Sequence, residues 1–116
     1  MPLTFDAVCE MALALPGAEL GRSYGMPAIR IASHLLVRLR EDGETIVLKV
    51  GFDEREMLME AEPGTFFVTD HYRNYPRVLV RLAHVHPHSL RRLIEQAWRQ
   101  VAPKRLAREF DLRRPD

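Results

Sequence analysis

The strongest constraint in the sequence is a pair of alternating runs, residues 34–41 and 45–50, on either side of Asp42-Gly43. Alternation of apolar and polar residues with a period of two is typical of a half-buried β-strand, because successive side chains point to opposite faces of a sheet. Asp and Gly both tolerate positive φ, so the dipeptide predicts a tight hairpin turn. The chain therefore contains an antiparallel strand pair.

Parity assigns the side chains of this pair to two faces. One face is expected to be apolar and to pack on helices, and it holds Leu35, Val37, Leu39, Ile46, Leu48 and Val50. The opposite face then holds Leu36, Arg38, Arg40, Val47 and Lys49.

Further strands are expected at residues 28–32, 65–69 and 77–83, with a short strand or extended link at 18–24. In the first, Arg30 has the opposite parity to Ile29 and Ile31. In the strand at 77–83, one face holds Arg77, Leu79 and Arg81, and the other holds Val78, Val80 and Leu82.

Helices are predicted at residues 4–15, 53–61, 87–101 and 103–110. Thr4 is a good N-cap for the first, and Asp53 has capping-box spacing for the second. Pro87 suits the first turn of the third. The tail at 111–116 is expected to fray. Because the helices and strands do not alternate regularly, the order predicts one α+β domain over residues 1–116, with an antiparallel sheet and helices packed on one face.

Size and composition agree with one globular domain. The 116 residues are 47% hydrophobic and 28% charged, which is ordinary for a folded, water-soluble chain. No apolar run approaches bilayer length, and the N-terminal residues lack a secretory pattern. A lone cysteine, Cys9, fits a reducing compartment. We therefore expect a cytoplasmic protein with no membrane partner.

The charge is distributed unevenly along the chain. Residues 1–68 carry six basic and eleven acidic side chains, whereas residues 69–116 carry eleven basic and five acidic ones. Such a division indicates an anionic partner.

Several short segments, in this order and spacing, are similar to the MmcQ/YjbR-like family over roughly residues 4–110. They are Leu15-Pro16-Gly17, Tyr24-Gly25-Met26-Pro27, Asp42-Gly43, Leu48-Lys49-Val50, Thr69-Asp70-His71-Tyr72, Val78-Leu79-Val80-Arg81-Leu82, Ala97-Trp98 and Pro103-Lys104-Arg105-Leu106. The resemblance implies a compact α+β fold like the double-wing domain of a phage transcription factor. Members of the family are often labelled DNA-binding on that similarity, and the resemblance brings no catalytic residues and no cofactor.

The basic side chains of several strands share one parity and therefore one sheet face, which gives an independent reason to consider DNA. Guanidinium groups gathered on one sheet face repel one another, and phosphates would relieve that repulsion. No acidic residue shares this parity within the strand interiors. The candidate DNA-binding residues are Arg30, Arg38, Arg40, Lys49, Arg77 and Arg81, with Arg73 from the aromatic link at 70–76.

Two other interpretations remain open for these residues. The arginines fit an ordinary solvated face whose side-chain stems cover apolar surface. They also fit a protein-interaction or small-ligand module with an acidic partner. A second basic group lies on the C-terminal helices and either extends a nucleic-acid surface or, as we expect, forms a solvated helix face: Arg91, Arg92, Arg99, Lys104, Arg105 and Arg108.

Catalytic and metal sites are not predicted. His84, His86 and His88 alternate, but Pro87 interrupts them and His86 suits a helix N-cap better than a metal site. Cys9 lies beside an apolar helix stripe and reads as structural. Asp70-His71 has residue types used in acid–base chemistry, yet adjacent extended residues point apart. The Tyr24-Gly25 pair is expected to be a turn.

Overall fold

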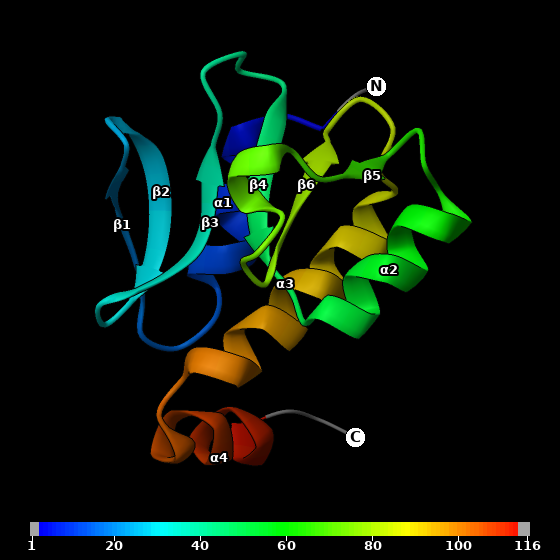
Figure 1. Cartoon of the computed structure of the whole chain (residues 1–116). Coiled ribbons are helices and arrows are strands. Elements are labelled where there is room, and N and C mark those ends of the chain that lie inside the picture. Colours follow the sequence, from blue (N-terminus) through cyan, green and yellow to red (C-terminus); the bar gives the residue numbers. More distant parts are fainter. Residues whose placement is uncertain (1–2, 114–116) are drawn as a thin grey trace.

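The structure is a computed structural model that describes residues 3–113. Over these residues, six strands form one antiparallel sheet in the order β1-β2-β3-β4-β6-β5 (Figure 1). The strands are β1 (Ala18–Ser23), β2 (Met26–Ile31), β3 (His34–Leu39), β4 (Thr45–Lys49), β5 (Phe66–Phe67) and β6 (Arg77–Arg81). The α+β class predicted from the sequence is confirmed.

The helices are α1 (Phe5–Leu13), α2 (Phe52–Ala61), α3 (Pro87–Val101) and α4 (Lys104–Arg113), with the short 3-10 turn η1 at Asp70–Tyr72. Helices α1 and α3 cover one face of the sheet, which we call the helix face. Helix α2 contacts β5 and β6, and α4 lies at the end of α3 (Figure 1). None of the helices within 3–113 is long and apolar enough to cross a membrane.

The main core lies between the helix face and α1 and α3. Ile46 and Leu48 of β4 meet Val78 and Val80 of β6 there, as parity predicts, and Trp98 of α3 is fully buried among them. The Trp98 Nε1 donates to the Pro16 carbonyl at 2.8 Å, which fixes the chain between α1 and β1. The opposite side of the sheet, called the second face below, holds Arg30, Val47 and Leu79.

One strand departs from simple alternation. The prediction placed Leu35 on the apolar face and Leu36 with the arginines, and both assignments are wrong. A register shift between β2 and β3 pairs Ile29 with Val37 but Arg30 with Leu35. This β-bulge reverses parity, so that Leu36 enters the core and Leu35 joins Arg30 on the second face.

Two helix boundaries also differ from prediction. Gly51, not Asp53, is the N-cap of α2, and no side chain caps that helix. The chain after Phe110 was expected to fray, but α4 continues through Arg113; residues 114–116 lie outside the described part. The Thr4 N-cap is confirmed, since its side chain accepts from the Ala7 amide at 3.2 Å.

Candidate functional site

Part of the second face is covered. Tyr72 of η1 packs on Val47 and Leu79 and forms a small apolar cluster with them. Phosphate binding by these arginines requires an uncovered sheet face, but near η1 residues 70–72 fold back onto the sheet and cover it. Periodicity within a strand does not reveal a distant segment that covers it.

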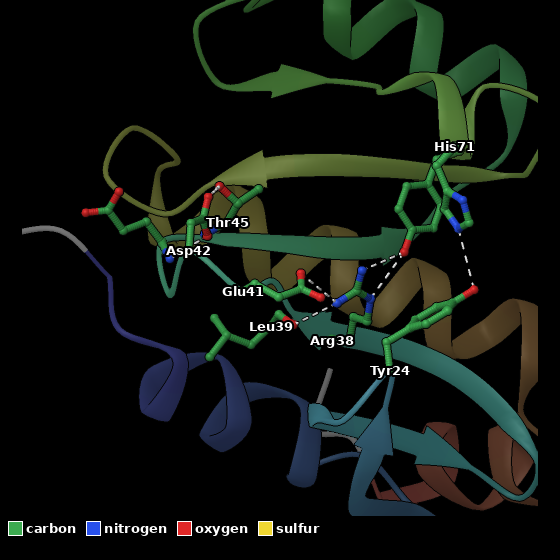
Figure 2. Close-up of polar contacts among 9 residues, drawn as sticks. Tyr24, Arg38, Leu39, Glu41, Asp42, Thr45 and His71 are labelled. Carbon is green, nitrogen blue, oxygen red and sulfur yellow. Dashed lines mark hydrogen bonds and ion pairs between the residues drawn. The ribbon is translucent and has the colours of Figure 1, made fainter.

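Arg38 lies under this cover and is only 5% exposed. Its Nε and Nη2 donate to the Tyr72 hydroxyl at 3.2 and 2.8 Å, and its Nη1 lies 3.6 Å from a Glu41 carboxylate oxygen (Figure 2). The Tyr24 ring centroid is 4.9 Å from the guanidinium carbon. Arg38 therefore supports neighbouring side chains and is not free to reach a phosphate.

A second buried guanidinium holds the segment after η1. Arg55 of α2 is 5% exposed. Its Nη1 donates to the carbonyls of Tyr72, Tyr75 and Arg77, and its Nη2 donates to that of Arg73, over 2.9–3.3 Å. One side chain thus satisfies four backbone acceptors and fixes residues 72–77 against α2.

Beside the covered part, the second face opens into a cavity of about 690 Å³. It lies between the β1–β2 turn and the segment 71–77. Its lining consists of Arg22, Ser23, Tyr24, Gly25, Arg30, Leu35, His71, Tyr72, Tyr75, Pro76 and Arg77. Among the described residues, the lining contains no carboxylate.

Two predicted cations, Arg30 and Arg77, meet in this cavity. Arg77 Nη1 donates to the Leu35 carbonyl at 2.8 Å, and Arg30 donates to the carbonyls of Arg22 and Ser33. Burial lowers the pKa of the Arg77 guanidinium; Tyr72 opposes this, and the charge of Arg30 lowers it further. Lys49 pairs with Arg77 across the strands, and burial followed by the Arg77 charge lowers its pKa. Lys49 therefore adds positive charge beside Arg77, although it does not itself line the cavity.

Tyr24 stands at the rim on a strained turn. It has φ 54°, and Gly25 follows at φ 75°. This pair of left-handed residues matches the tight turn expected from the sequence. The ring is 68% exposed, and its hydroxyl lies 3.5 Å from His71 Nε2 (Figure 2). Tyr75, at 57% exposed, is a second accessible ring.

Like Lys49, the remaining candidate cations lie outside the cavity. Arg40 lies at the β3–β4 turn, where its charge helps to lower the pKa of Asp42. The exposed Arg73 pairs with Asp70 at 2.8 Å. Arg81 lies on the Phe67 ring, 4.0 Å from its centroid, and contacts the Gly64 carbonyl.

An acidic side chain does share the second face, contrary to the prediction. Glu19 of β1 pairs in register with Arg30. Residues 18–24 were expected only as a short strand or extended link, for which the sequence predicts no parity, so Glu19 could not be placed from the sequence. Arg30 nevertheless directs its described hydrogen bonds to backbone carbonyls, not to Glu19.

Two important residues were not recognised from the sequence. Arg55 was considered only as part of a capping pattern, and its basic charge within an acidic helix start was the available signal. Tyr24 is predicted as a turn residue, and the sequence gives no support for a ligand contact there. Their importance depends on contacts to residues 17 to 47 positions away, which short patterns do not encode.

Of the alternating histidines, His86 caps a helix. His86 is the N-cap of α3, and its Nδ1 accepts from the His88 amide at 3.1 Å, as predicted. Within 3–113, no cluster of three or more His, Cys, Asp or Glu residues is arranged to hold a metal. Burial, then Asp6, raises the pKa of Cys9, which agrees with an inert thiol.

The geometry defines a class: an α+β domain with an antiparallel sheet and a basic, tyrosine-lined cavity on its second face. A family model described as YjbR matches residues 13–100. The chain therefore belongs to the YjbR family, as its sequence resemblance implied.

One solved structure shares this fold, and two mycobacterial proteins match part of the sequence. The crystal structure of Deinococcus radiodurans protein DR2400, with the family domain DUF419, is similar with a TM-score of 0.74 and 18% identity, over 91% of this chain and 86% of that one. Uncharacterized proteins Rv2570 of Mycobacterium tuberculosis and Mb2600 of Mycobacterium bovis are each 47% identical over 53 residues. That match covers 46% of this chain and only 41% of each relative.

Proposed function

We propose that the chain is a DNA-binding domain of the cytoplasm without catalytic activity, and that Arg30, Lys49 and Arg77 bind phosphates. The observation that supports this is the charge of the cavity. Arg30 and Arg77 line the cavity together, Lys49 pairs with Arg77 on the neighbouring strand, and the described lining offers no carboxylate to neutralise them. A phosphate would neutralise them and release counterions.

DNA affinity measured by fluorescence anisotropy tests the proposal. With about three phosphates neutralised, the logarithm of the duplex binding constant should fall with the logarithm of salt concentration at a slope of about −2 to −3. The double variant Arg30→Gln/Arg77→Gln should lose most of this binding and flatten the slope.

The matched control is Arg91→Gln/Arg92→Gln, which removes the same charge from exposed positions of α3, on the helix face. It should bind almost as the wild type does. Equal weakening in both double variants would mean that general charge, not the second face, attracts DNA.

The same cations also suit an acidic protein partner. That function takes precedence if the wild type binds no DNA at low salt but binds an acidic partner in a manner that depends on Arg30 and Arg77.

A further inference from the structure

The cavity has the size and shape of a small-ligand site. At about 690 Å³ it falls within the usual range for pockets that enclose a compact ligand. It is bounded by the β1–β2 turn on one side and by residues 71–77 on the other. A flat face that accepts a duplex backbone would not need such a recess.

The rim of the cavity carries aromatic rings that are exposed to solvent. Tyr24 and Tyr75 are both more than half exposed, on opposite walls of the recess, and the His71 ring lies between them. Arg38 supports the Tyr24 ring through a cation–π contact. Exposed tyrosines held in position are suited to stack on a flat ring, since every nucleobase offers a π face.

The floor presents hydrogen-bond donors. A guanidinium has five N–H donors; the described bonds use one of these in Arg77 and two in Arg30. The others remain for an anionic oxygen. Donors for a phosphate and rings for a base therefore line the same recess.

The walls are also held in place before any ligand arrives. Arg55 fixes the segment that carries Tyr72 and Tyr75, and Tyr72 is itself bonded to Arg38. A preorganised site loses less entropy on binding than a flexible one.

From these observations we infer that the cavity binds one unpaired nucleotide, with its base against Tyr24 or Tyr75 and its phosphate on Arg30 and Arg77. In a duplex, neighbouring bases stack on both faces of each base, so that only an unstacked base can contact the tyrosines. A single strand and a free mononucleotide both offer this combination of an accessible base and a phosphate. The inference rests on the proposed function and specifies which form of nucleic acid it prefers.

The test compares a labelled thymidine oligonucleotide of roughly ten residues, a duplex of the same length, and dTMP as a competitor. The wild type should bind the single strand at least tenfold more tightly than the duplex. Tyr24→Leu/Tyr75→Leu should reduce single-strand affinity about tenfold or more and leave duplex affinity and its salt slope unchanged. Tyr24→Phe/Tyr75→Phe keeps both rings and should bind as the wild type does.

The outcomes separate the two proposals. If duplex and single strand bind equally and the Leu variant binds normally, the nucleotide site is refuted although DNA binding stands. If dTMP binds in a tyrosine-dependent manner but neither DNA form does, the site is supported with a free nucleotide as its ligand, and DNA binding is refuted. Binding of none of the three refutes both. Thermal unfolding of each variant verifies that it is folded.

Discussion

For the single residue Arg38, the sequence predicts the sheet face on which the side chain lies but not its burial. Its parity placed it correctly on the second face, but its burial depends on Tyr72, which is 34 residues away. The hydroxyl of Tyr72 accepts two hydrogen bonds from a charged donor group that has little access to water. The two side chains therefore depend on each other.

Tyr72→Phe should lower the free energy of unfolding by about 1–3 kcal/mol, because two N–H donors of buried Arg38 lose their acceptor. Urea denaturation measures the change. Tyr75→Phe is the control, since that ring is largely exposed, and it should change stability by less than about 0.5 kcal/mol. Equal effects of the two substitutions would contradict the role of the buried pair.

At the scale of elements, the segment 72–77 depends on α2. Arg55 provides the connection, through four carbonyls that a lysine ammonium cannot reach together. The cavity wall is therefore positioned by a helix that does not line the cavity.

Arg55→Lys should cost about 2–3 kcal/mol of stability and speed hydrogen exchange of the amides in residues 72–77, because several charge-assisted bonds are lost. Exchange measured by mass spectrometry reports the segment directly. Arg91→Lys, at an exposed position of α3, should leave both quantities unchanged. Unaltered exchange in Arg55→Lys would show that the segment holds itself in place.

The β3–β4 hairpin contains an acid-sensitive contact. Burial alone would raise the pKa of Asp42, but bonds from the Glu44 amide and from the Thr45 hydroxyl and amide, with the Arg40 charge, hold that pKa below its usual value. A depressed folded-state pKa contributes stability above the unfolded-state pKa of about 4, and this contribution disappears as pH falls through the folded-state value.

Asp42→Asn should therefore be less stable than the wild type at pH 7, with the difference shrinking as the pH falls below about 4. Urea denaturation across pH 2–7 measures it. Glu60→Gln, on the exposed side of α2, should track the wild type throughout. A difference that does not depend on pH would contradict the linkage.

Much of the element order was predictable, because periodicity and caps are local signals. The 34–50 hairpin and the helix at 87–101 were identified from their patterns alone. The bulge that reverses Leu35 and Leu36 was not, since it arises from the register between two strands. Of the site, the sequence identified Arg30 and Arg77 by parity, but the tyrosine rim and the Arg55 clamp depend on tertiary contacts.

For the whole molecule, α4 completes the core where α1 meets β1. Phe110 packs edge-on against Trp98 with ring centroids 5.1 Å apart, and Leu106 lies against Gly17. Gly17 has φ 79°, and an added Cβ would be 2.7 Å from Leu106 Cδ1. The turn after α1 and the last helix therefore share one packing site.

Gly17→Ala should destabilise the protein by about 1–3 kcal/mol, through left-handed strain and displacement of Leu106. Gly43→Ala is matched, because Gly43 has φ 71° and nothing lies within 4 Å of an added Cβ. Thermal unfolding should show that Gly17→Ala destabilises the protein more than Gly43→Ala does. This difference should vanish when both substitutions are made in a Leu106→Ala background. An excess that persists there would assign the cost to something other than α4.

The left-handed backbone of Tyr24 has a consequence for protein engineering. Glycine and asparagine adopt this conformation more easily than a bulky aromatic residue does. A library screened for heat resistance alone should therefore enrich Gly or Asn at position 24, and the surviving clones would lack the ring that faces the recess. A substitution at this one position of a surface turn would then raise thermal stability and lower ligand affinity.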